Sequence, residues 1–319
     1  MLKRMSLKKI LTSTLTLVAL FLLYIIPNNN ELKDIKQELE YVNADVLTHS
    51  IFLLDSNNYI AKTNIIVKTL DKEELVKEII EVLISDGVGE SSIPSGFKSY
   101  IPSDTKINNI SIEDNVITVS FNEDFLDVSK NIEEKMIEGL VFSLTEIESI
   151  DKVKINIEDK PLTFLPKCKK NIPDILDRSF GVNKNYDISN SKNVSSVTLY
   201  YINKYNDDFY YVPVTKYLND NHEKIEIIIE QLKNPTLNSN LMSFMNENTK
   251  LESYELDDKT LKLVFNSDIF SNFEEKEILE EVIYTISLSI EDNYNVCSVI
   301  FNVGDEEIQK SVLKSIDCD

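Results

Sequence analysis

This chain contains an internal repeat, and the repeat limits its architecture more than any other property of the sequence. Four short segments recur in the same order, namely TKI at 105–107 and TKL at 249–251, VSFN at 119–122 and LVFN at 263–266, VFSL at 141–144 and IYTI at 283–286, and NIED at 156–159 and NVGD at 302–305. Self-similarity at a nearly constant spacing indicates one structural unit that occurs twice. Because a domain takes roughly 150 residues, a chain of 319 residues can hold both copies.

Both copies begin with the same predicted elements. Two β-rich runs with Asn or Asp pairs between them predict a hairpin at residues 50–54 and 59–67, and again at 197–202 and 209–215. An amphipathic helix follows in each copy. Asp71 and Glu74 have the D-x-x-E spacing of a capping box, and Asp220 and Glu223 repeat this spacing in the second copy.

The second half of each copy is predicted to contain another hairpin, another helix and a final strand. Apolar and polar residues alternate over 117–122 and 261–266, which is typical of strands that bury one face. Amphipathic helices are expected over 132–144 and 278–290. The predicted fold class is therefore α+β, with two tandem β-β-α-β-β-α-β domains, each a mainly antiparallel sheet covered on one face by two helices.

An apolar, uncharged run at residues 10–26 precedes the repeats and predicts a membrane segment. Its length suits a cleaved signal peptide or a retained signal anchor, and the absence of a small-x-small cleavage site favours retention as a transmembrane helix. The basic residues before it are Lys3, Arg4, Lys8 and Lys9. The positive-inside rule then places the N-terminus in the cytoplasm and the body outside it. We expect a single-pass protein of the cell membrane.

These signals divide the chain into six parts. They are a cytoplasmic basic stub and transmembrane signal anchor at 1–30, a helical stalk at 31–49, a first domain at 50–160, a linker at 161–194, a second domain at 195–308 and a C-terminal tail helix at 309–319. The linker has no sustained periodicity and is long for a passive connection. It either packs across both domains through Ile175, Leu176 and Phe180 or forms a loose tether.

The net charge of −21 argues against nucleic acid as a partner. All four basic residues of the N-terminal stub precede the first acidic residue, Glu31, so the body is more acidic than the whole chain. Such a body is repelled by phosphate backbones. The three cysteines contain no C-x-x-C pair, which gives no sign of a zinc site. A bridge between Cys297 and Cys318 stays open, but a free, buried thiol at Cys297 is favoured.

The sequence offers few groups for catalysis. His49 and His222 are its two histidines, and neither lies in a catalytic motif, so both are expected to face solvent or to pack. Adjacent glutamates such as those at 73–74 lie in first helical turns, where acidic residues favour the helix dipole. We predict a non-enzymatic protein with no catalytic, cofactor or metal site. The competing class, an envelope enzyme or cell-wall-polymer-binding protein, would need a concave site with converging side chains.

Tyrosines concentrate in the first hairpin of the second copy. Because aromatic residues are enriched in interface cores, Tyr200, Tyr201, Tyr210 and Tyr211 are the predicted interaction residues. Alternate tyrosines could instead fill the core of the domain. An exposed sheet edge is another place at which a partner strand could add.

The repeats resemble the GerMN domain. The second copy carries four motifs in the order of that family, namely LYY at 199–201, YVPVTK at 211–216, EQLKNP at 230–235 and VIYTI at 282–286. The first copy carries IPSDTKI at 101–107. The resemblance spans roughly residues 50–160 and 196–308. Two such domains behind a membrane anchor are similar to the GerM-type sporulation and spore-germination proteins.

The resemblance implies a scaffold or assembly factor that acts through protein contacts. Its partners would be other envelope or sporulation-complex proteins, with self-association as a further option. The implied location is the space between the mother-cell and forespore membranes, where the protein would help to build a multiprotein channel or platform. The family pattern has a lipidated cysteine after the signal, whereas the first cysteine here is Cys168. The alternative is an accessory envelope protein of a sensor kinase or cell-wall system.

Overall fold

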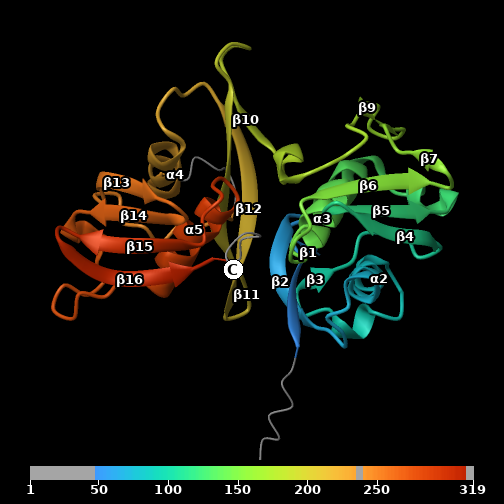
Figure 1. Ribbon diagram of the computed structural model, residues 1–319, viewed down its shortest axis with the longest axis horizontal. Helices are drawn as coiled ribbons and strands as arrows, with labels where there is room; N and C mark the ends of the chain where they lie inside the picture. The colour runs from blue at the N-terminus through green and yellow to red at the C-terminus, as the bar shows by residue number, and fades with distance from the viewer. Residues whose placement is uncertain (1–46, 235–239, 314–319) are drawn as a thin grey trace, which may run out of the picture. The chain divides into compact units, whose positions relative to one another are not determined.

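The computed structural model describes residues 47–234 and 240–313 (Figure 1). The first copy consists of β1 (Thr48–Asp55), β2 (Ile60–Ile66), α2 (Lys72–Leu83), β3 (Phe97–Lys98), β4 (Ile107–Glu113), β5 (Val116–Phe121), α3 (Lys130–Leu144) and β6 (Lys152–Ile157). The second consists of β11 (Ser195–Tyr205), β12 (Asp208–Leu218), α4 (Lys224–Lys233), β13 (Leu251–Asp257), β14 (Thr260–Phe265), α5 (Glu280–Glu291), β15 (Ser298–Val303) and β16 (Glu306–Val312).

Between the copies lie the short strands β7 (Lys160–Pro161), β8 (Phe164–Leu165), β9 (Lys170–Asn171) and β10 (Asn185–Asp187), together with the 3-10 helix η3 (Arg178–Phe180). The described part of the chain thus has four α-helices and mostly antiparallel strand pairs, which confirms the α+β class.

The second half of each copy forms a four-stranded sheet, in the order β4-β5-β6-β7 or β13-β14-β15-β16. The central pairs, β5 with β6 and β14 with β15, are parallel. Parallel neighbours need a crossover connection, and α3 and α5 supply it. The alternating residues of β5 and β14 bury the face towards these helices, as the period-two pattern predicts.

The prediction of a single sheet in each copy is wrong for the first hairpins. These hairpins join each other in one six-stranded sheet, in which β12 pairs antiparallel with β2 and Tyr211 lies opposite Lys62. Helix α3 packs against both β1 and β6, so it separates the first hairpin from the sheet of its own copy. As a result β1 is covered on both faces, and Ile51 to Leu54 are all buried.

Capping fixes where the first helix of each copy begins. The Asp71 carboxylate accepts a hydrogen bond from the Glu74 amide at 3.1 Å, as predicted for α2. In α4 the capping box is instead formed by Glu223 and Glu226. Asp220 is not the cap, because its carboxylate accepts from the His222 amide in the preceding turn. Helix α4 therefore starts three residues later than the sequence spacing suggested.

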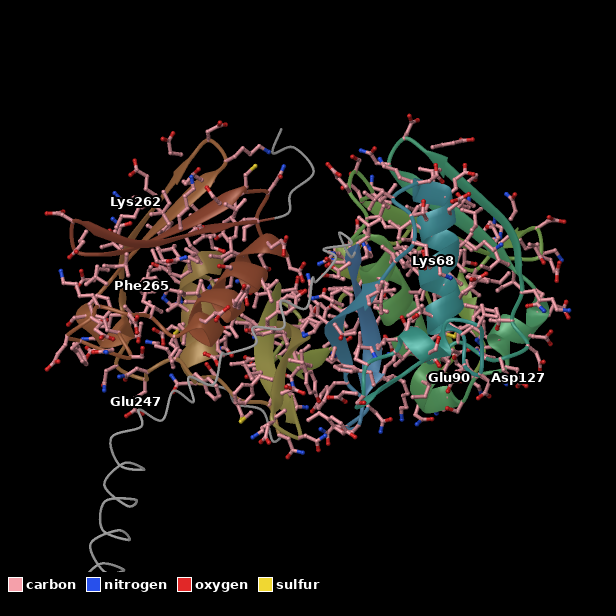
Figure 2. The ribbon with its side chains drawn as sticks, turned by 90° about the horizontal axis from the view of Figure 1, so that it is seen from below. Lys68, Glu90, Asp127, Glu247, Lys262 and Phe265 are labelled. Atoms are coloured by element: carbon pink, nitrogen blue, oxygen red, sulfur yellow. The ribbon has the colours of Figure 1, made fainter. Side chains whose placement is uncertain are left out.

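Apolar side chains form two buried clusters, one mainly in each copy. Phe121 and Phe125 stack at 4.4 Å between ring centroids in the first copy. Phe265, labelled in Figure 2, lies 6.3 Å from the ring of Phe301 in the second. Aromatic packing at the end of the central strand therefore occurs in both copies.

The linker is a packed segment and not a loose tether. Leu176 is buried and its amide and carbonyl both bond to Val153 of β6, at 2.8 Å each. Val182 is also buried, and its carbonyl accepts from Thr215 of β12. Ile175 and Phe180 contribute less, since Ile175 is exposed and Phe180 half-buried. The linker thereby touches strands of both copies.

Three predictions concern the ends of the chain. The transmembrane anchor at 1–30 and residues 31–46 of the stalk lie outside the described residues, while Thr48 and His49 already belong to β1. Within the described ranges, no helix is both long enough and apolar enough to cross a membrane. The tail helix is wrong over 309–312, which belong to β16, because pairing with β15 satisfies this backbone.

Candidate functional site

The structure places Tyr200, Tyr210 and Tyr211 at the junction between the two copies. Tyr201 lies in the core of the second copy, where its hydroxyl donates to the carbonyl of Gln231 at 3.2 Å. Tyr200, Tyr201 and Tyr210 are 1%, 0% and 8% exposed. Tyr211 is half-buried beside the ring of Tyr284, with 5.8 Å between the centroids. Because their strands are covered on both faces, the first three cannot serve as a free contact surface. That prediction is corrected for them.

Two of the tyrosine hydroxyls hold polar groups at this junction. The Tyr200 hydroxyl donates to Asp292 Oδ2 at 2.9 Å, just beyond α5. The Tyr210 hydroxyl donates to Asp55 Oδ2 at 2.9 Å, so a strand of the second copy binds the end of β1 in the first. The Asn203 amide donates to the same Asp55 oxygen, also at 2.9 Å. The two hydrogen bonds to Asp55 cross the boundary between the copies, whereas the bond from Tyr200 to Asp292 lies within the second copy.

A group of four charged residues and one tyrosine, which we call the junction cluster, completes the contact. It comprises Lys62, Glu146, Arg178, Tyr200 and Asp292. The Arg178 guanidinium, carried by the linker, forms ion pairs with Glu146 of the first copy and Asp292 of the second. Lys62 Nζ lies 3.0 Å from Glu146. One linker arginine thus connects both copies.

Burial makes the charges of the junction cluster interdependent. The side chains of Glu146 and Asp292 are 6% and 2% exposed. Burial alone would raise the pKa of Glu146, but the charges of Lys62 and Arg178 outweigh it and lower this pKa to about 2. Burial would likewise lower the pKa of Arg178, yet Asp292 and Glu146 raise it well above its ordinary value. Glu146 and Arg178 are therefore held in their charged forms.

A cavity of about 870 Å³ adjoins the junction cluster. Residues of both copies line it, among them His49, Glu146, Arg178 and Asp292. His49 therefore faces this cavity at the start of β1, whereas His222 is exposed and contacts Asp220 Oδ1 at 2.6 Å. Among residues 47–234 and 240–313, no group of three or more His, Cys, Asp and Glu side chains is arranged to hold a metal ion.

The cysteines differ from the interpretation favoured by the sequence. Cys297 is disulfide-bonded, so the free thiol expected there is wrong. Cys318, the partner considered from the sequence, lies outside the described residues. Cys168 is the free cysteine of the described chain, and its amide donates to Glu133 Oε2 at 2.6 Å.

An exposed surface with apolar side chains lies elsewhere, on the edge strand β13. Residues 252–257 are all exposed, and Tyr254 and Leu256 retain 40% and 54% of their surface. These two residues pair across the ladder with Leu263 and Leu261, which are fully buried. Directly paired residues share a face of the sheet. Tyr254 and Leu256, which we call the edge patch, therefore extend the apolar core face into solvent.

The first copy covers the corresponding positions. Ile110 and Ile112 of β4 pair with Val119 and Ile117 of β5 in the same register. Both isoleucines are half-buried, whereas Tyr254 and Leu256 are exposed. Helix α2 packs against β4 there. The two copies thus differ at one edge, although their sequence patterns are similar. The alternation of Tyr254 and Leu256 is visible in the sequence, but their exposure depends on the packing of a helix.

Comparisons with known proteins agree with this architecture. The family described as "Germane: Sporulation and spore germination" matches residues 50–163 and 198–309, which is more than half of the chain. The chain belongs to the Germane family. Its membership confirms the resemblance to GerMN-domain proteins that the repeated motifs indicate, and supports a role in sporulation or spore germination.

One Germane relative is similar to this chain in both sequence and structure. The spore germination protein GerM of Bacillus subtilis (strain 168) is 32% identical over 269 residues, which cover 82% of this chain and 72% of that protein. The solved tandem GerMN domains of the sporulation protein GerM from Bacillus subtilis match with a TM-score of 0.75 and 29% identity, covering 82% of this chain and 92% of that one. The Germane fold is thus shared across both copies.

Proposed function

We propose that this Germane protein is a membrane-anchored, extracytoplasmic scaffold or assembly factor in sporulation or spore germination. It acts by binding other proteins and not by catalysis. Residues 10–26 and the basic residues before them supply the anchor in this proposal. The acidic body then stands outside the cytoplasm, where the disulfide of Cys297 is stable.

The observation that carries the proposal is the edge patch on β13. An edge strand presents unpaired backbone groups that can pair with a strand from another chain. Tyr254 and Leu256 would add side-chain contacts to that pairing, since exposed apolar residues beside a free edge favour a protein partner. A partner strand that carries apolar residues at alternate positions would fit this edge.

The junction cluster supports the same proposal because it joins the two copies. The six-stranded sheet pairs a strand of one copy with a strand of the other, and the ion pairs of Arg178 link the residues that follow α3 and α5. A scaffold must hold its contact surfaces at a set separation in order to position its partners. The buried contacts between the copies meet that requirement.

Site-specific photocrosslinking in the native host tests the edge patch. A photoreactive phenylalanine analogue at position 254 is expected to give a discrete adduct with another envelope protein in sporulating cells. The same analogue at Val88, which is 83% exposed in the first copy, is the matched control and should give none. Adducts would be identified by mass spectrometry after purification of the tagged chain.

The pattern of adducts decides between the alternatives. A partner from a sporulation complex, captured at position 254 and not at 88, supports the scaffold proposal. Capture of a sensor kinase or a cell-wall enzyme in growing cells would favour the accessory-factor role instead. Equal labelling at both positions, or none at 254, would contradict a docking role for the edge patch.

A further inference from the structure

A second cavity, of about 390 Å³, lies between α3 and the linker, away from the junction cluster and the edge patch. The N-terminal half of α3 forms one wall, with side chains at positions 130, 131, 134, 135 and 138. Residues at spacings of three and four share one face of a helix, so these side chains point to the same side. Lys170 of β9 and Lys184 beside β10 form the opposite wall.

Hydrogen bonds fix the linker wall of this cavity. Asn183 donates from its side-chain amide to the carbonyls of Ile60 and Pro213, at 2.7 Å each. Its backbone amide donates to Glu138 Oε2 of α3 at 2.9 Å. One asparagine thereby holds the linker against both copies and against the helix. The cavity is built by tertiary contacts and does not depend on a loose surface loop.

The charges of the cavity oppose those of the whole protein. Four lysines and two glutamates line it, in a chain with a net charge of −21. Glu134 forms ion pairs with Lys170 and Lys184, and Glu138 lies 3.3 Å from Lys184 Nζ. Both carboxylates are therefore engaged by two of the four lysines. The remaining positive charge comes from Lys130 and Lys135.

Lys130 and Lys135 form no ion pair with a carboxylate within the described residues. Lys135 donates to the backbone carbonyl of Asn58, and its ammonium lies 5.7 Å from the centroid of the Tyr59 ring. Burial lowers the pKa of Lys135, although Glu138 and Asp55 partly oppose this shift. A desolvated ammonium of this kind is stabilised when an anion approaches it.

The number of uncommitted charges indicates the kind of anion. A phosphate group carries about 1.5 to 2 negative charges at neutral pH and three strong acceptor oxygens. Two lysines without carboxylate partners match this charge, and lysine is a common phosphate ligand in proteins. The rings of Tyr59 and Tyr186 also line the cavity and can contact the carbon part of an ester. A carboxylate, with a single charge, would leave one ammonium uncompensated.

We propose that the cavity between α3 and the linker binds a dianionic phosphate group, with Lys135 as its principal ligand and Lys130 at the rim. The phosphate is either inorganic phosphate or the head of a small phosphate monoester. The proposal is independent of the scaffold function, since it uses neither the edge patch nor the junction cluster. Binding there would hold the linker against α3, since both walls contribute cations.

Calorimetric titration of the full-length chain in a neutral detergent tests this site at low ionic strength. Inorganic phosphate, glycerol 3-phosphate and acetate are titrated separately, at equal ionic strength. Lys135→Met is expected to weaken phosphate binding about tenfold or more, because a charge-assisted contact is lost. Lys106→Met removes an exposed lysine outside the cavity and serves as the control, with unchanged binding.

The ligands separate the two sources of phosphate. Tighter binding of glycerol 3-phosphate than of inorganic phosphate identifies the ester, and the reverse order identifies the free ion. Either result, combined with the loss in Lys135→Met, supports the site. Three results would overturn the site. Acetate could bind as well as phosphate, or wild type and Lys135→Met could bind phosphate equally. The third is no heat from either phosphate compound at 10 mM, which is about the weakest binding of interest.

Discussion

Replacement of Arg178 with methionine is expected to lower the free energy of unfolding by about 3–5 kcal/mol. Methionine keeps much of the apolar volume beside the ring of Phe142, which lies 4.8 Å from the guanidinium carbon. The loss therefore comes from the charge. Asp292, whose side chain is 2% exposed, would be left buried with only the Tyr200 hydroxyl as a described side-chain partner.

Urea denaturation of wild type and Arg178→Met measures this loss. Lys204→Met is the matched control, because Lys204 pairs with Asp207 on the surface, where the side chains are 42% and 103% exposed. Such a pair contributes less than about 1 kcal/mol. A similar small change for both variants would show that the junction cluster does not stabilise the contact between the copies.

Stability is expected to depend on pH through Glu146. Its pKa is about 2 in the folded protein, whereas a glutamate in an unfolded chain titrates near about 4.3. Because the folded pKa is the lower one, ionised Glu146 stabilises the folded protein. This stabilisation is complete above the unfolded pKa and is lost as the pH falls towards 2. The difference corresponds to about 3 kcal/mol at neutral pH.

Other carboxylates act in the opposite direction, so a comparison with a variant is needed. Burial raises the pKa of Glu138 and of Glu291, and these groups destabilise the folded protein less as they become protonated. Comparison of wild type with Glu146→Gln isolates the contribution of the Glu146 charge to the free energy of unfolding. The variant's unfolding free energy should be about 3 kcal/mol below that of wild type at pH 7, with the gap narrowing to below about 1 kcal/mol near pH 2.

Urea titrations at several pH values between 7 and 2 provide the measurement. Glu113→Gln, at an exposed position of β4, is the control and should follow wild type at every pH. A gap between wild type and Glu146→Gln that does not depend on pH would mean that Glu146 is not held ionised by Lys62 and Arg178.

Much of the fold could be predicted because its signals are local and occur twice. Alternation along β5 and β14, and the apolar stripes of α2 and α4, each report on a face of one element. The first hairpins carry a different signal. Residues 51–54 and 199–202 are apolar or aromatic without alternation, which is typical of strands buried on both faces. Pairing of the two hairpins explains that pattern.

The junction cluster could not be predicted, because its members lie far apart in the chain. Arg178 and Asp292 are 114 residues apart in sequence, and Arg178 and Glu146 are 32 apart. No short motif records such a contact. The tyrosines illustrate the same limit, since Tyr200 and Tyr210 suit an interface by composition and were found at one, but that interface lies inside the chain.

The most direct test of the scaffold proposal is fluorescence microscopy of the full-length chain, tagged at its C-terminal end, in the native host during growth and sporulation. We predict signal at the septal or engulfing membrane of sporulating cells, which becomes diffuse along the membrane when Tyr254 and Leu256 are both replaced with lysine. Uniform envelope signal in growing cells, unchanged by these two substitutions, would contradict the proposal.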